Sequence, residues 1–120
     1  MSAEPDPIYS LEDVGPATVI HFTTDHLANQ PRLYQLYEIV DSDGKNRLVL
    51  DFSTVTMITS LALVVFVSLR RKVIDKGGKL SIYGLEENLV DLFHRSRLQN
   101  FFPICQTQQE ALSMVLASSR

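Results

Sequence analysis

The chain has 120 residues, the size of one compact domain, and its apolar fraction of 45% and charged fraction of 21% are typical of globular proteins. Its formal net charge is −3, and the scattered cations form no basic stripe, which argues against direct binding to nucleic acid. The single cysteine, Cys105, excludes an internal disulfide, and the longest apolar run, residues 61–67, is too short to span a bilayer.

The first half of the chain predicts a tail followed by alternating strands and a helix. Residues 1–7 are small, acidic and interrupted by prolines, which predicts a flexible tail ahead of a single cytoplasmic domain at residues 8–118. The turn signal Gly15-Pro16 lies between two strand patterns and indicates a hairpin. The predicted elements are strands at residues 8–13 and 17–23, a helix that begins at Asn29 or Gln30 and ends at Val40, and a buried central strand at residues 47–52.

The second half predicts further helices and strands in alternation. Apolar residues at helical spacing predict a long helix at residues 60–76, which Gly77-Gly78 would end. Thr107 and Glu110 have the spacing of a capping box and indicate the start of the last helix. The remaining predicted elements are a strand at residues 79–83, a helix at residues 86–94, a short strand at residues 101–105 and the last helix, which ends at Leu116. This order is typical of an α/β fold with right-handed crossovers.

Motifs for catalysis or metal binding are missing from this sequence. His21, His26 and His94 lie far apart without metal-ligand spacing, and Cys105 has no basic neighbour to activate it. There is no nucleophile elbow and no glycine loop for phosphate. No metal, cofactor or enzymatic activity is therefore expected. Asp51, at the end of the central strand, has two open interpretations: it lies where α/β sheets tend to bind ligands, or it braces the loop that follows.

Thr59 and Ser60 place adjacent hydroxyls where a loop meets the predicted long helix. A helix N-terminus offers unpaired N–H donors and partial positive charge, so it tolerates a phosphate. Phosphorylation there would confront a bound partner with new negative charge. The alternative is that one of these hydroxyls only caps an ordinary helix.

Three passages of the chain resemble the STAS domain family, which contains bacterial anti-sigma-factor antagonists. Residues 47–58, RLVLDFSTVTMI, resemble the central strand and following loop of that family, with Asp51 on its characteristic aspartate. Residues 70–85 resemble its helix–GG–strand passage, and residues 92–112 its C-terminal third. The resemblance implies a STAS-like mixed sheet of four to five strands, with about four helices packed mainly on one side.

For function, the resemblance implies a switch that binds an anti-sigma factor, itself a serine kinase, and is released on phosphorylation. Residues 59–63, TSLAL, align with the family motif around the phosphoacceptor, which falls on Ser60, with Thr59 as the alternative acceptor. Thr59 replaces an aspartate, Leu61 a small residue and Ala62 a glycine. These departures leave open a STAS module that binds a scaffold or transporter partner constitutively, without phosphorylation.

The resemblance also implies partners and a binding surface. The expected partners are an anti-sigma factor/serine kinase and a serine phosphatase that resets the switch, with the chain itself a monomer or weak dimer that neither binds nucleic acid nor inserts into a membrane. The residues expected to contact the partner are Asp51, Ser53, Thr54, Thr56, Met57, Thr59, Ser60, Leu61 and Leu63.

Overall fold

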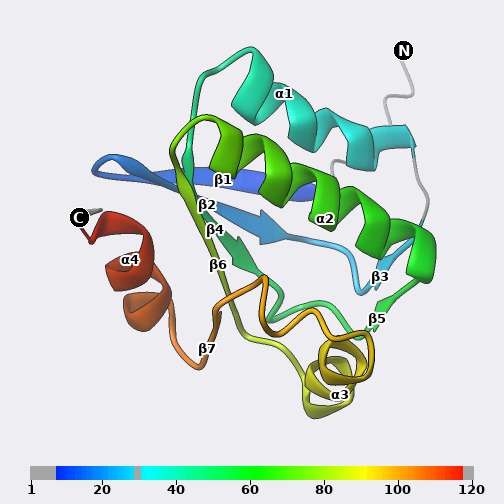
Figure 1. The fold of residues 1–120 in the computed structure, drawn as a ribbon. Coiled ribbons are helices and arrows are strands. Elements are labelled where there is room, and N and C mark those ends of the chain that lie inside the picture. The colour runs from blue at the N-terminus through cyan, green and yellow to red at the C-terminus, as the bar shows by residue number, and fades with distance from the viewer. Residues whose placement is uncertain (1–7, 29–30, 118–120) are drawn as a thin grey trace.

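The computed structural model describes residues 8–28 and 31–117, and Figure 1 shows their arrangement. The tail predicted for residues 1–7 and the predicted helix start at Asn29 or Gln30 lie outside the described residues. The predicted architecture is confirmed: a mixed five-stranded sheet is covered mainly on one side by helices.

The sheet has the strand order β1-β2-β4-β6-β7. Strand β1 pairs antiparallel with β2, while β4, β6 and β7 continue parallel to β2. The middle residues of the parallel strands β4 and β6 are buried on both faces, as expected for a sheet with layers above and below. The strand bounds are β1 Tyr9–Val14, β2 Ala17–Phe22, β4 Arg47–Asp51, β6 Lys79–Tyr83 and β7 Ile104–Cys105.

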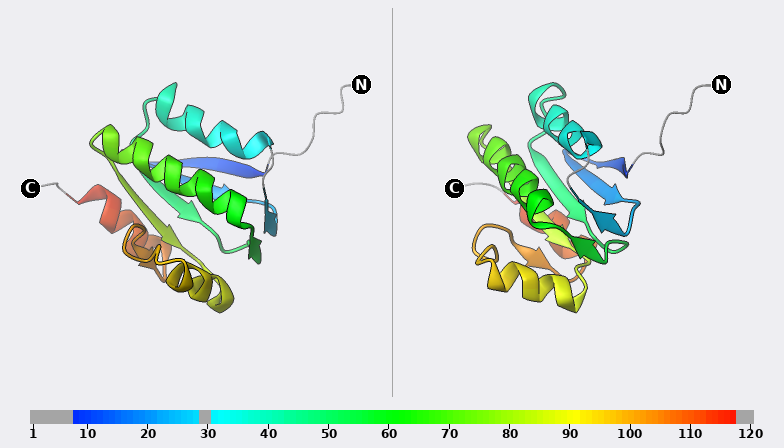
Figure 2. Two further views of the ribbon diagram at one scale, coloured as in Figure 1. Left: turned by 45° about the vertical axis from the view of Figure 1, so that its right-hand side comes forward. Right: turned by 90° about the vertical axis from the view of Figure 1, so that its right-hand side faces the viewer.

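Helices connect the parallel strands and lie on one face of the sheet. The first crossover begins with a 3-10 turn, η1, at Pro31–Gln35 and continues as α1, Leu36–Asp41. The second crossover is α2, Ser60–Asp75, which packs beside α1 (Figures 1 and 2). The third crossover contains α3, Glu87–Arg95. Its Leu89 and Phe93 belong to the main hydrophobic core, which lies between the sheet and these helices.

Aromatic rings fill the core between the sheet and α2. Phe22 from β2 stacks on Phe52 at 5.1 Å between ring centroids, and Phe66 from α2 meets both rings edge-on. These rings are buried, and large buried rings contribute strongly to the hydrophobic free energy of folding. This core therefore fixes where α2 begins relative to the strand ends.

The opposite face of the sheet is covered by α4, Gln108–Leu116, over small side chains. Ala17, Val19 and Val49 meet Ala111 and Val115 of the helix there. The predicted capping box is confirmed, since Thr107 Oγ1 accepts from Glu110 N and Glu110 reaches back to Thr107 N. Helix α4 lies over the part of this face near the starts of β4 and β6, where Arg47 and Lys79 bind carbonyls at the end of the helix, and it leaves His21, near the end of β2, partly exposed.

The structure contains one pair of short strands that was not predicted from the sequence. Residues 53–58 were predicted as a plain connection, but Met57–Ile58 forms a short strand, β5, that pairs parallel with β3, His26–Leu27. Two-residue strands leave no periodic pattern in a sequence, and their partners here are about thirty residues apart. Along the described part of the chain, no helix has both the length and the apolar character needed to cross a membrane.

Candidate functional site: the loop after β4 and the start of α2

The candidate site is built on residues 53–59, here called the connecting loop, which leads from β4 to α2. Phe52 and Val55 are fully buried and attach the loop to the core. The residues between and after them face outward: Ser53, Thr54, Thr56 and Met57 are exposed. The loop therefore presents hydroxyls and one thioether to solvent on a fixed base.

Asp51 holds the beginning of the connecting loop. Its Oδ1 accepts from the Ser53 amide at 2.9 Å and from the Ser53 hydroxyl at 2.6 Å. Gly84, which directly follows β6, lies so close that a Cβ there would come within 2.9 Å of the Ser53 nitrogen. Asp51 is itself buried, with 8% of its surface exposed, so the structure supports its role as a brace.

The end of the connecting loop is held by the segment that follows β2. The carbonyl of Asp25 accepts from the amides of Thr56 at 2.7 Å and Met57 at 3.1 Å. The amide of Thr59 then donates to the carbonyl of Leu27 at 2.9 Å. The loop is thus fixed at both ends before α2 begins.

Thr59 and Ser60 have different roles at the start of α2. Thr59 is the N-cap: its backbone is extended, and its hydroxyl accepts from the Ala62 amide at 3.2 Å. Ser60 is the first helical residue and is exposed, and within the described part of the chain its hydroxyl makes no hydrogen bond. The capping function therefore belongs to Thr59, which leaves the Ser60 hydroxyl available at the helix N-terminus.

Exposed apolar side chains surround Ser60. Met57, Leu61 and Val64 expose 53%, 60% and 60% of their surface, and we call these three residues the apolar patch. Leu61 and Val64 lie one helical turn apart and therefore share a face of α2. An apolar patch rimmed by polar groups is typical of a protein-binding surface.

The structure brings most of the predicted contact residues together and buries two of them. Asp51 braces the loop, and Leu63 is 8% exposed within the main core, so neither presents its side chain to a partner. Val64 was not among the predicted residues, although its spacing of three from Leu61 could have indicated it. The predicted contact residues that lie at least partly at the surface are Ser53, Thr54, Thr56, Met57, Thr59, Ser60 and Leu61.

A row of polar side chains crosses the uncovered sheet face behind the connecting loop. His21 Nε2 lies 2.8 Å from Glu12 Oε1, and His21 Nδ1 lies 2.6 Å from Asp51 Oδ2. Tyr83 lies opposite Asp51 on the next strand, β6, and helps to lower the pKa of the same carboxyl group. This row was not predicted, because it depends on strand register between residues thirty positions apart.

Burial and hydrogen bonding shift the pKa values in this row. Burial lowers the pKa of His21, but the hydrogen bonds and negative charges of Glu12 and Asp51 outweigh it and raise the pKa above its usual value. Burial would raise the pKa of Asp51, yet the hydrogen bonds from Ser53, His21 and Tyr83 hold it below its usual range. Burial and the Asp51 charge raise the pKa of Tyr83, which stays a neutral donor.

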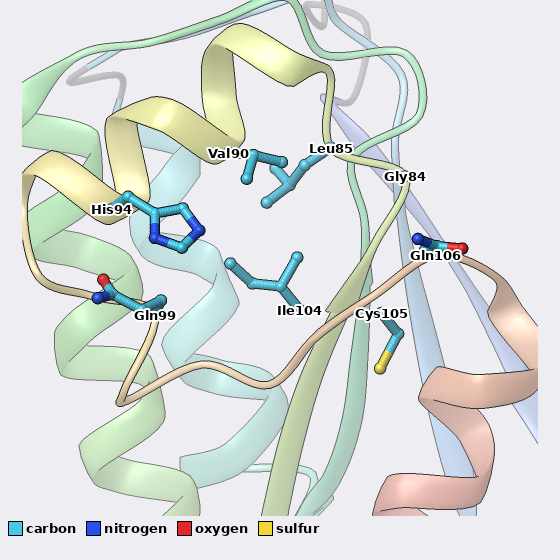
Figure 3. Close-up of a pocket in the computed structure, with 8 residues that line it drawn as sticks. All are labelled: Gly84, Leu85, Val90, His94, Gln99, Ile104, Cys105 and Gln106. Atoms are coloured by element: carbon cyan, nitrogen blue, oxygen red, sulfur yellow. The ribbon is translucent and has the colours of Figure 1, made fainter.

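No group of metal-ligating side chains occurs among the described residues. A cavity of about 570 Å³ lies between α3 and the ends of β6 and β7, lined in part by Leu85, His94 and Cys105 (Figure 3). Burial and the charge of Glu110 raise the pKa of the Cys105 thiol, which disfavours the nucleophilic thiolate.

Comparison with known proteins identifies the family to which this fold belongs. A family model described as STAS domain matches residues 23–111. An anti-sigma factor antagonist from Mycobacterium paratuberculosis has a similar structure, with a TM-score of 0.79 at 22% identity, covering 91% of this chain and 93% of that one.

The protein SpoIIAA has the same fold at lower similarity. The Bacillus cell fate determinant SpoIIAA in its phosphorylated form gives a TM-score of 0.66 at 16% identity, covering 88% of this chain and 96% of that one. SpoIIAA in its unphosphorylated form, described as an anti-sigma factor antagonist, gives 0.65 at 14% identity, covering 85% and 91%. No curated protein matches the chain. Because the family model covers well over half of its residues, the chain belongs to the STAS domain family.

Proposed function

We propose that this protein is a partner-switching regulator that binds an anti-sigma factor with serine-kinase activity and is released when Ser60 is phosphorylated. The observation that carries the proposal is the position of Ser60: an exposed hydroxyl at the first residue of α2, not used as the cap and next to the apolar patch. In this proposal the protein acts in the cytoplasm by binding and has no catalytic activity of its own. A serine phosphatase would return it to the binding form.

A phosphate on Ser60 is compatible with the fold. The first turn of α2 contains no acidic residue, so the positive end of the helix dipole is not yet compensated by a side chain. Phosphorylation adds about −2 charge with three acceptor oxygens, which the N–H groups of the first turn favour. The modification would therefore leave the structure of the protein intact.

The same phosphate would oppose partner binding. A partner that covers the apolar patch must remove water from Leu61, the next residue after Ser60, and from Val64, one helical turn further along α2. Burying a hydrated dianion beside them is costly unless the partner supplies a matching cation. A difference of about 3 kcal/mol between the two states is enough for a hundredfold change in affinity.

Leu61 occupies the position where the family motif has a small residue. With 60% of its surface exposed, it contributes little to the core and is available as an apolar contact. The proposal therefore assigns Leu61 to the partner interface. A kinase that accepts this chain must have room for the larger side chain beside the acceptor hydroxyl.

The decisive experiment measures binding of wild type, Ser60→Ala and Ser60→Asp to purified anti-sigma factors from the source organism, by isothermal titration calorimetry. We expect Ser60→Ala to bind like wild type and Ser60→Asp to lose at least tenfold in affinity. Gln108→Asp is the matched control, because Gln108 is the first residue of α4 and lies outside the connecting loop and the apolar patch. It should bind like wild type.

Incubation of the same proteins with ATP tests the phosphorylation itself. Phosphate on Ser60 in wild type, found by mass spectrometry and absent from Ser60→Ala, is the expected result. Equal affinity of wild type and Ser60→Asp, together with no phosphate on Ser60 or Thr59, would overturn the switch. It would support a STAS module that holds its partner constitutively.

A further inference from the structure

The polar row on the uncovered sheet face has a consequence for the connecting loop. Asp51 uses both carboxylate oxygens: Oδ1 binds Ser53, the first residue of the loop, and Oδ2 faces His21. His21 in turn lies between Asp51 on β4 and Glu12 on β1. A single imidazole ring therefore links the outer strand of the sheet to the residue that sets the direction of the loop.

We propose that His21 is a positioning residue for the connecting loop, and that its protonation state sets how firmly the loop is held for partner binding. This inference rests on the proposed function only where it concerns the partner; the effect on the loop is a property of the isolated protein. His21 would not contact the partner. It would act through Asp51 and Ser53.

The geometry requires a protonated ring for both contacts to be hydrogen bonds. Each ring nitrogen faces a carboxylate oxygen, at 2.6 Å and 2.8 Å, and a carboxylate can only accept. A neutral imidazole has one N–H, so one nitrogen would direct its lone pair at a negatively charged oxygen. Deprotonation must therefore break or lengthen one contact, and it removes the positive charge that compensates the buried Asp51.

The surroundings of the ring leave few other groups to compensate. Glu12 from β1 and Asp51 from β4 are the charged groups that face His21, and Tyr83 lies opposite Asp51 on β6. Helix α4 packs on this face, but its Glu110 acts on Cys105 instead of on the ring. The raised pKa of His21 agrees with this arrangement of two acceptors and no second cation.

The sign of the effect follows from the direction of that shift. A group whose pKa is raised by folding stabilises the folded state below its usual pKa, about 6.5 for histidine, and loses that contribution as the pH rises through the raised value. The loop should therefore be held most firmly at pH 6 and less firmly above neutrality. At acid pH a separate loss occurs when Asp51 is protonated, as the pH falls through its lowered pKa.

NMR of the isolated protein tests the inference without any partner. The His21 ring and the Ser53 amide are followed together from pH 5 to pH 9, with hydrogen exchange at Ser53 as a second readout. We expect both signals to change with one midpoint, and Ser53 exchange, corrected for the intrinsic pH dependence of an unprotected amide, to accelerate about three- to tenfold above it.

Three variants make the test specific. His21→Gln should remove the pH dependence of Ser53. Glu12→Gln removes only the negative charge of the outer acceptor, so it should move the midpoint to lower pH while leaving the loop unchanged at pH 5. His26→Gln is the control, because His26 is exposed and its ring lies near Asp25, outside the polar row. A merely structural histidine would not make the midpoint seen at Ser53 depend on Glu12.

Independent midpoints for His21 and Ser53, or an unchanged midpoint in Glu12→Gln, would overturn the inference. Partner affinity then separates it from the proposed function. If Ser60→Asp abolishes binding but the pH profile of affinity is the same in wild type and His21→Gln, only the positioning role fails. If Ser53 follows His21 but Ser60→Asp binds normally, only the switch fails.

Discussion

The helices α2 and α4 begin in the same way chemically and differ in what surrounds the beginning. Each has a threonine N-cap whose hydroxyl accepts from the amide three residues later. In α4 that third residue is Glu110, which completes a capping box and adds negative charge to the first turn. In α2 it is Ala62, which is fully buried.

The two helix starts therefore differ in whether they can accept an added negative charge. The α4 start satisfies its own N–H groups and charge with a side chain of the same turn. The α2 start has no acidic side chain in its first turn, and its Ser60 and Leu61 are exposed. The two N-cap residues alone would make the helix starts look equivalent; the third residue after the cap, buried Ala62 or charged Glu110, separates a self-contained helix end from one able to accept an added anion.

Stability should change most when α2 receives the glutamate that α4 has three residues after its N-cap. Ala62→Glu would place a carboxylate at a position with no exposed surface, next to the apolar core. We expect the free energy of unfolding to fall by about 3 kcal/mol or more, because the side chain is both too large and unpaired. Urea denaturation measures it. A loss below about 1 kcal/mol would show that the α2 start can open to accommodate a capping box.

A smaller effect separates the two caps themselves. Thr107→Ala should cost about 1–2 kcal/mol of stability, because it removes the acceptor for Glu110 N and disrupts the reciprocal box. Thr59→Ala should cost about 1 kcal/mol, since one hydrogen bond to Ala62 is lost. Parallel urea unfolding of both variants checks the order. A larger loss for Thr59→Ala would contradict the view that α4 depends more on its cap.

The smallest effect has the opposite sign. Ser60→Asp should stabilise the isolated protein by about 0.5 kcal/mol, because it places the first negative charge at the α2 N-terminus. Gln108→Asp should gain less, since Glu110 already supplies charge to the first turn of α4. Thermal unfolding at low salt and at 0.5 M salt compares the two, and the Ser60→Asp gain should shrink with salt. A destabilised Ser60→Asp would argue against a phosphate being tolerated there.

Local patterns in the sequence were enough to predict most of the fold. The capping box at Thr107, the long helix after Thr59 and the strand before Asp51 each follow from spacing within a few residues. The helix predicted to end at Val40 was found as a 3-10 turn, Pro31–Gln35, followed by a short α-helix, Leu36–Asp41.

The candidate site was predicted in part, and the missing part is non-local. The chain around Leu61 is apolar on nearly every side of the helix, so sequence alone did not show that Leu63 faces the core and Val64 faces solvent. The pairing of β3 with β5 and the contact of His21 with Asp51 depend on the parallel register of β2 and β4. Short-range spacing in the sequence encodes neither this register nor the pairing of β3 with β5.

The close approach of Gly84 to Ser53 restricts how this family member can diverge. Gly84 has a positive φ of 84°, and the space its side chain would need is taken by Ser53 backbone atoms at 2.9 and 3.0 Å. A lineage that replaces this glycine must therefore also reroute the loop that begins at Ser53. Joint change at positions 53 and 84 among homologues would mark descendants whose connecting loop has taken another path.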